Sequence, residues 1–193
     1  MRTFIAVEIP EDVRQKIGRY VDSLRDSIQN VKWVSPENLH LTLKFLGEVN
    51  ENDTDALIDC IRPIFSVFSS FELVLEHTGF FPSPKNPRVI WIGSDGGADN
   101  LLDIFHELEH CLEAFGIDRD ERMFSPHLTI GRVKRNRGKH HAPAAITGDI
   151  PEFESAAFRV NSIALIKSTL TSQGPIYEKL YEGTLKDARI GMV

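Results

Sequence analysis

One four-residue motif occurs twice in the sequence, once in each half. "HLTL" begins at His40 and "HLTI" begins at His127, and each copy lies in an apolar run of the kind that forms a strand. A single His-x-Thr is easily met by chance, but two copies in similar surroundings indicate two corresponding strands of a duplicated architecture. We therefore expect one bilobal domain over 1–193, with lobes of approximately 1–93 and 98–185 that each carry one copy.

Helical and strand periodicities alternate along the chain, which favours an α+β fold. Apolar residues recur at spacings of three and four in three segments and alternate with polar residues in most of the others. The predicted helices run from Pro10 to about residue 28, over 53–68 with a kink or break at Pro63, and over 98–115. The predicted strands cover 3–9, 39–49, 71–77, 88–93, 125–133, 156–160, 162–168 and 176–182.

The composition argues against several classes of protein. No apolar run approaches the roughly 20 residues of a membrane span, and the start of the chain lacks the apolar stretch of a secretion signal. Two cysteines, Cys60 and Cys111, are too few for a disulfide framework or a cysteine-based zinc site. We therefore expect buried thiols, no membrane partner and a reducing, cytoplasmic setting. We also expect a monomer, although no motif in the sequence bears on the oligomeric state.

The net charge of −6 argues against a protein that coats nucleic acid through a broad basic face. Any contact with nucleic acid must then be local. One basic cluster directly follows the second motif, and it is either a solvated loop or such a local contact. Its members are Lys134, Arg135, Arg137, Lys139, His140 and His141.

The period of a strand decides which side chains of the motif act together. Successive side chains point to opposite faces, so His40 and Thr42 share one face while the two leucines take the other, and His127 and Thr129 do the same. If a pseudo-two-fold axis relates the lobes, both pairs face one cleft. The alternative is that both segments are ordinary structural strands whose histidines lie on the surface without a functional role.

Two imidazoles and two hydroxyls in one cleft suit displacement at phosphorus. One neutral imidazole can accept a proton while a charged one donates a proton, and hydroxyl groups can bind the non-bridging oxygens. This chemistry needs no metal or other cofactor, and we expect none.

The chain resembles the two-histidine (2H) phosphoesterase superfamily, and specifically the RNA 2′,3′-cyclic phosphodiesterases also called 2′-5′ RNA ligases. The resemblance lies in "RTFIAVEIP", "WVSPENLHLTLKFLGEV", "GFFPSPKNPRVIWIG", "FSPHLTIGRV" and "IALIKSTLTSQGPIYEKL". It implies a bilobal fold with antiparallel sheets around a central cleft and helices outside. It also implies hydrolysis of a 2′,3′-cyclic phosphate, on RNA or on a small cyclic nucleotide, to a 2′-phosphate. In some members a 5′-hydroxyl replaces water and gives a 2′-5′ linkage.

Carried onto this sequence, the resemblance makes His40 and His127 the catalytic pair and Thr42 and Thr129 phosphate-binding residues. We assign His127 as the base that activates water and His40 as the acid that protonates the departing O3′. These labels can be exchanged without changing a pH profile, because two coupled groups titrate as a pair.

Further cations and aromatic residues lie close to the two motifs. Arg132 occupies the place of a family arginine that binds phosphate, yet strict alternation puts it on the face opposite His127 unless Gly131 marks a bulge. Lys44 shares the His40 face by the same rule, as a second phosphate-binding cation or an ordinary solvated lysine, and Phe45 falls on the core face. The remaining aromatic residues near the motifs, which stack a base or pack in the core, are Phe80, Phe81 and Trp91.

Two other functions compete with this hypothesis. "HELEH", from His106 to His110, matches the H-E-x-x-H zinc pattern with Glu107 as the base of a metalloprotease. Both histidines lie opposite the apolar stripe of their helix, so a solvated surface pair is the simpler interpretation. The other alternative is an RNA-end-binding protein that keeps the cleft without turnover.

Overall fold

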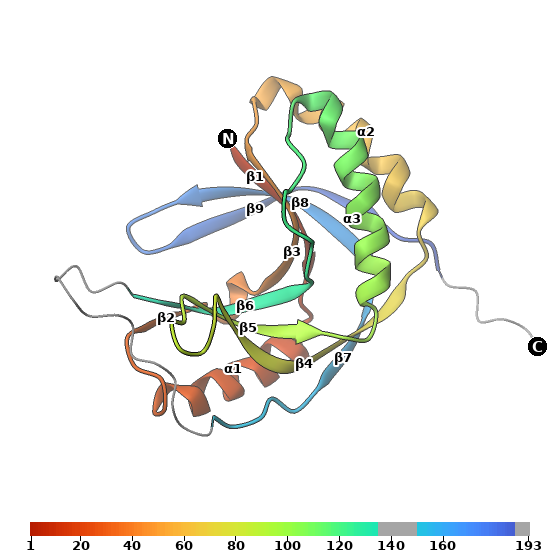
Figure 1. Cartoon of the computed structure of the whole chain (residues 1–193). Helices are drawn as coiled ribbons and strands as arrows, with labels where there is room; N and C mark the ends of the chain where they lie inside the picture. Colours follow the sequence, from red (N-terminus) through yellow and green to blue (C-terminus); the bar gives the residue numbers. More distant parts are fainter. Residues whose placement is uncertain (135–149, 188–193) are drawn as a thin grey trace, which may run out of the picture.

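A computed structural model describes residues 1–134 and 150–187, so most of the predicted basic cluster, from Arg135 to His141, lies outside the described residues. Figure 1 shows helices arranged around a curled antiparallel sheet, which confirms the predicted α+β class. The strands are β1 (Arg2–Glu8), β2 (Val31–Trp33), β3 (His40–Glu48), β4 (Phe71–Phe81), β5 (Val89–Ser94), β6 (His127–Val133), β7 (Ala156–Val160), β8 (Ser162–Leu170) and β9 (Pro175–Thr184). The helices are α1 (Glu11–Arg25), α2 (Thr54–Val67) and α3 (Ala98–Leu112), with short 3₁₀ turns η1 (Pro36–Asn38), η2 (Glu51–Asp53) and η3 (Glu113–Phe115).

The strands form one continuous sheet in which the two halves of the sequence are interleaved. The order is β7-β4-β5-β6-β3-β1-β8-β9, and β2 pairs with β6 outside this path. β8, from the second half of the chain, pairs with β1 and is followed by β9 at the edge of the sheet, whereas β4, from the first half, lies between β5 and β7. Strands from both halves of the sequence therefore lie on either side of the β3–β6 junction, and the division into lobes 1–93 and 98–185 stays a prediction.

Most predicted elements are present, and the differences have local causes. α2 continues through Pro63 as one helix. β4 extends to Phe81 because its last residues pair with β5, where the sequence suggested a loop. The three-residue β2 was not predicted, since so short a run carries no recognisable period.

The two faces of the sheet are packed differently. The buried stripes of all three helices and the inward residues of the strands form one large apolar core on one face. A small second cluster on the opposite face consists of Phe4, Ala6, Ala164 and Ile166, with Tyr177 against it. The large core fixes which residues of each strand point inward, and so determines what the other face presents.

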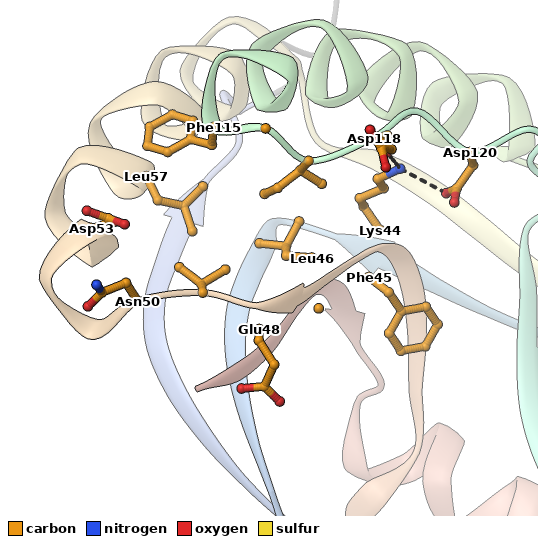
Figure 2. Close-up of a pocket in the computed structure, with 14 residues that line it drawn as sticks. Lys44, Phe45, Leu46, Glu48, Asn50, Asp53, Leu57, Phe115, Asp118 and Asp120 are labelled. Carbon is orange, nitrogen blue, oxygen red and sulfur yellow. Dashed lines mark hydrogen bonds and ion pairs between the residues drawn. The ribbon is translucent and has the colours of Figure 1, made fainter.

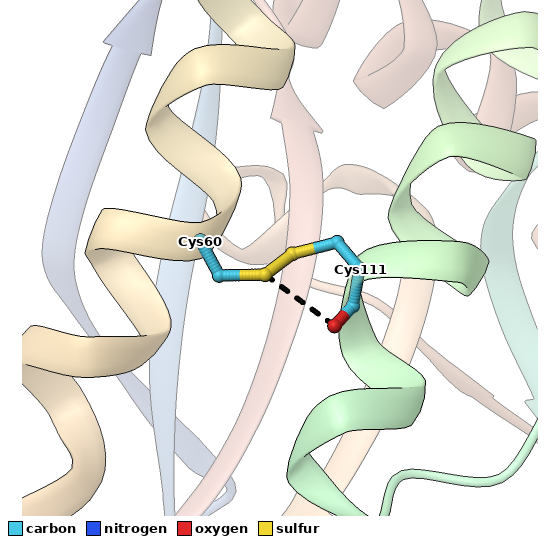
Figure 3. The surroundings of a disulfide bond; sticks show 2 residues. All are labelled: Cys60 and Cys111. Atoms are coloured by element: carbon cyan, nitrogen blue, oxygen red, sulfur yellow. Dashed lines mark hydrogen bonds between the residues drawn. A yellow bond between two sulfur atoms is a disulfide. The ribbon is translucent and has the colours of Figure 1, made fainter.

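The prediction of two separate thiols was wrong. Cys60 of α2 and Cys111 of α3 form a disulfide with a Cα to Cα distance of 6.3 Å (Figure 3). The two helices pack side by side, which brings together cysteines that are 51 positions apart in the sequence. Disulfides are rare in reducing compartments, so the cytoplasmic location loses this support and stays a prediction.

None of the helices in residues 1–134 and 150–187 has the length and hydropathy that crossing a membrane requires.

Candidate active site

The two motif strands, β3 and β6, are neighbours in the centre of the sheet. They are antiparallel and meet at one pair of residues, Leu41 and Leu128, which are both completely buried in the large core. Paired residues point to the same side of a sheet, and their neighbours along each strand point to the other side. His40, Thr42, His127 and Thr129 therefore share the face opposite the large core, and all four are half-buried. We call this the histidine face.

Both imidazoles are held in the same way. The Nδ1 atom of His40 lies 2.8 Å from the carbonyl oxygen of Asn38, and the Nδ1 atom of His127 lies 2.7 Å from the carbonyl oxygen of Ser125. A carbonyl oxygen can only accept a hydrogen bond, so Nδ1 must donate in each case. In the neutral ring Nε2 then carries no proton and is ready to accept one.

Each imidazole also lies against two aromatic rings. The ring centroid of His40 is 4.7 Å from that of Phe4 and 5.1 Å from that of Tyr177. The ring centroid of His127 is 5.1 Å from that of Phe81 and 6.1 Å from that of Trp91. These contacts restrict how each ring can turn and reduce its exposure to water.

The surroundings of His40 favour its neutral form. Burial lowers the pKa of His40, the charge of Arg132 lowers it further, and the hydrogen bond to Asn38 acts in the opposite direction with a smaller effect than burial. The charge of Arg132 acts on Tyr177 as well as on His40. Burial raises the pKa of Tyr177, which keeps its hydroxyl protonated and able to donate a hydrogen bond.

A β-bulge in β6 explains why Arg132 lies on this face. In the pairing with β5, Trp91 is opposite Thr129 and Ile90 is opposite Gly131, so Ile130 is an extra residue. The extra residue reverses the alternation from that point on. Arg132 therefore points to the same side as Thr129, as expected if a bulge occurs at Gly131. No larger residue fits at Gly131 without a shift, because a Cβ there would lie 2.8 Å from a methyl group of Val31.

An equivalent bulge occurs in β3 at the corresponding position. In the pairing with β1, Ala6 is opposite Thr42 and Ile5 is opposite Lys44, so Leu43 is the extra residue. The two copies of the motif thus share both their sequence and a bulge directly after the threonine. The bulge reverses the faces of the next two residues, Lys44 and Phe45.

The predicted position of Lys44 on the histidine face was wrong, as was that of Phe45 in the core. Lys44 is 2% exposed and points towards the helices, whereas Phe45 is 61% exposed and points to the other side of β3 (Figure 2). The ring centroid of Phe45 lies 6.0 Å from that of Phe4, which places it beside the His40 end of the site. Phe45 is the counterpart of Arg132, since each follows its motif histidine by five residues.

Lys44 is instead the centre of a buried ionic cluster. Its ammonium forms ion pairs with Glu109 of α3 and with Asp120, the latter at 3.2 Å, and it donates a hydrogen bond to the carbonyl oxygen of Asp118. The backbone N–H of Asp120 donates to Glu109 at 3.0 Å. Lys44, Asp118 and Asp120 line an open pocket of about 480 Å³ between β3, η2 and the segment that follows α3 (Figure 2). The cluster attaches that segment, which leads to His127, to the strand that carries His40.

Sequence reasoning missed the contributions of Phe4, Phe45 and Tyr177 to the histidine face. Phe45 could not be found by alternation, because nothing in "LHLTLKF" reveals the bulge. Phe4 meets His40 because β1 pairs directly with β3, and Tyr177 joins them from β9, two strands further along the sheet. Of the aromatic residues named from sequence, Phe81 and Trp91 flank His127, and Phe80 is partly buried against the large core.

The zinc-like motif lies elsewhere. His106 and His110 project from the exposed side of α3, where the side chain of His110 is 82% exposed. In residues 1–134 and 150–187, no three side chains of His, Cys, Asp or Glu are placed to hold a metal ion together. Glu109, one of the two variable residues of the motif, is a member of the Lys44 cluster.

A family model described as LigT like Phosphoesterase matches the chain twice, at residues 7–91 and 92–177. The chain belongs to the LigT-like phosphoesterase family. The double match agrees with the duplicated motif, since one copy falls in each matched segment.

Other LigT-like phosphoesterases resemble this one over nearly their whole length. The chain is 37% identical to an RNA 2′,3′-cyclic phosphodiesterase of Methanothermobacter thermautotrophicus, covering 92% of this chain and 95% of that one. It is 39% identical to the protein of the same name from Aeropyrum pernix, covering 92% and 99%.

Solved structures show the same fold. A protein of Thermus thermophilus superposes with a TM-score of 0.82 at 28% identity, covering 97% of this chain and all of that one. Escherichia coli LigT in complex with 3′-AMP superposes with a TM-score of 0.78 at 25% identity, covering 95% and 97%.

The burial of Lys44 predicts a large loss of stability when its charge is removed. Lys44→Met leaves Glu109 buried without its counter-ion, and we expect the free energy of unfolding to fall by about 3 kcal/mol or more in denaturant titrations. Lys44→Met with Glu109→Leu should recover most of this loss, because no buried charge then lacks a partner; the carboxylate of Asp120 is 56% exposed and stays solvated. Lys85→Met, at an exposed lysine, should change little; an equal loss there would refute this account of Lys44.

The position of Arg132 predicts a shift in the titration of His40. Arg132→Gln removes a charge that lowers the pKa of His40, so this pKa should rise towards its usual value while remaining below it because of burial. NMR titration of the imidazole C–H resonances measures the change. Arg19→Gln, on the exposed side of α1, should leave it unaltered. An unchanged titration in Arg132→Gln would show that the guanidinium does not act on His40.

Proposed function

We propose that this LigT-like phosphoesterase opens a terminal 2′,3′-cyclic phosphate of RNA to a 2′-phosphate by acid–base catalysis between His40 and His127. The observation that carries the proposal is the pair of imidazoles on adjacent strands, each fixed through Nδ1 by a backbone carbonyl. The names of the relatives from Methanothermobacter and Aeropyrum support the substrate. The complex of E. coli LigT with 3′-AMP supports the binding of a nucleotide.

The reaction moves two protons in opposite directions. One Nε2 accepts a proton from water as its oxygen attacks phosphorus, and the other Nε2 gives a proton to O3′ as the P–O3′ bond breaks. The products are a 2′-phosphate and a free 3′-hydroxyl. Water and the two imidazoles account for every atom and proton of this step, so it needs no metal or other cofactor. If a 5′-hydroxyl takes the place of water, the same two transfers give a 2′-5′ linkage.

The other groups of the histidine face stabilise the charge on phosphorus. The hydroxyls of Thr42 and Thr129 donate to the non-bridging oxygens, and Arg132 supplies a positive charge near the same point. Lys44 has no part in this step, because its ammonium lies in the buried cluster behind the strand. Phe45 and the rings around the histidines offer apolar faces to the ribose and base.

Which histidine is the base and which is the acid is a separate question. We assign His127 as the base and His40 as the acid, the same assignment that we made from the sequence. In the free protein the lowered pKa of His40 acts against its role as acid. The negative charge of a bound phosphate raises the pKa of a neighbouring imidazole, and so offsets this effect in the complex.

The test of the proposed function is hydrolysis of a short RNA that ends in a 2′,3′-cyclic phosphate, in the presence of a chelator. Wild-type protein should convert the RNA end to a 2′-phosphate, and either His40→Ala or His127→Ala should lower kcat by roughly 10²- to 10⁴-fold with folding intact. His106→Ala with His110→Ala is the matched control and should stay within a few-fold. Tight binding of the RNA end without turnover would instead indicate a non-catalytic RNA-end-binding protein.

A sulfur leaving group separates the two roles. When sulfur replaces the bridging O3′, the departing thiolate needs little help from an acid, since its conjugate thiol has a far lower pKa than an alcohol. This substrate should restore most of the activity of His40→Ala and leave His127→Ala impaired. Rescue of His127→Ala in place of His40→Ala would reverse the assignment.

A further inference from the structure

Three cations continue the histidine face beyond Thr129. Arg132 reaches this face because of the bulge in β6. Lys32 of β2 is directly opposite Arg132 in the pairing of β2 with β6, so their side chains point to the same side. Lys134 follows two positions after Arg132, and its backbone N–H donates a hydrogen bond to the carbonyl oxygen of Asn30, the residue before β2. We call Lys32, Arg132 and Lys134 the cation strip.

The charge of the cation strip is not neutralised locally. All three side chains are exposed, and within residues 1–134 and 150–187 none of them has a carboxylate within ion-pair distance. Lys16, Lys167 and Lys179, in other parts of the fold, are each paired with a glutamate. A protein with a net charge of −6 therefore leaves, among its described residues, a row of positive charge without carboxylate partners next to its proposed phosphate site.

We propose that the cation strip binds the phosphodiester backbone of an RNA chain just upstream of its cyclic end. This inference rests on the proposed function, which places the terminal phosphate between the two histidines. Arg132 belongs to both sites, so the row of charge starts at the reacting phosphate and runs away from it. From Thr129 to Lys134 the strand advances by roughly 17 Å at about 3.3 Å per residue, enough for phosphates beyond the terminal one.

The continuity of the strip favours a nucleic-acid backbone over an acidic peptide. Backbone phosphates carry one negative charge per nucleotide and follow directly from the terminal nucleotide. Lysine side chains act as flexible point charges without base preference, which suits positioning of the chain and not reading of its sequence. The expected specificity is thus for oligonucleotides over mononucleotides.

The test compares two substrates with the same 3′ end, adenosine 2′,3′-cyclic phosphate and a ten-nucleotide RNA ending in the same group. Lys32→Gln with Lys134→Gln should lower kcat/KM for the RNA by roughly tenfold at low salt and leave the mononucleotide within twofold. The slope of log(kcat/KM) against log salt for the RNA should become shallower by about 1.4, because two single-strand phosphate contacts are lost. Arg19→Gln with Lys186→Gln removes the same charge elsewhere and should change neither value.

The outcomes distinguish this inference from the proposed function. If wild-type protein hydrolyses both substrates but the Lys32/Lys134 variant matches the Arg19/Lys186 variant, the cation strip is not an RNA site and the function stands. If no cyclic phosphate is hydrolysed, the proposed function fails. In that case, fluorescence anisotropy with the ten-nucleotide RNA carrying a 2′-phosphate still tests the cation strip. The inference then requires that the Lys32/Lys134 variant binds this RNA more weakly and with less dependence on salt than wild-type protein, and that the Arg19/Lys186 variant does not. Equal losses on both substrates would also overturn it.

Discussion

The single pairing of Leu41 with Leu128 is the contact on which the site depends. It joins β3 to β6, and through them the two halves of the sheet. Because both leucines are buried under the helices, the residues on either side of each must turn to the opposite face. Two histidines that are far apart in the sequence therefore come together without a dedicated loop. A shift of either strand by one residue in the pairing register would turn its histidine into the core and its leucine to the opposite face.

The repeated bulge turns this symmetric arrangement into an asymmetric one. Both strands gain an extra residue after the threonine, so the fifth residue after each histidine reaches the histidine face. In one strand that residue is the cation Arg132, and in the other it is the aromatic Phe45. A nucleotide is asymmetric in the same way, with a charged phosphate and a flat base. Two equal motifs can thus hold a substrate in one direction.

Much of the fold and half of the site follow from local patterns in the sequence. The helices and most strands have clear periods, and the two His-x-Thr pairs share a face by simple alternation. The reversal of Lys44 and Phe45 could not be predicted, because a bulge is set by pairing with β1 and leaves no mark in β3 itself. The interleaving of the strands and the pairing of Cys60 with Cys111 likewise depend on contacts between distant segments.

The interleaved strand order also constrains how the protein is made. β1 leaves the ribosome first, yet one of its two neighbours, β8, begins only at Ser162. At typical rates of synthesis this neighbour appears roughly 10 to 30 s later. During that interval β1 exposes an unpaired edge, which is the kind of surface that invites pairing with another chain. For the edge of β1, the risk of pairing with another chain, and so of aggregation, is therefore higher in the growing chain than in the folded protein.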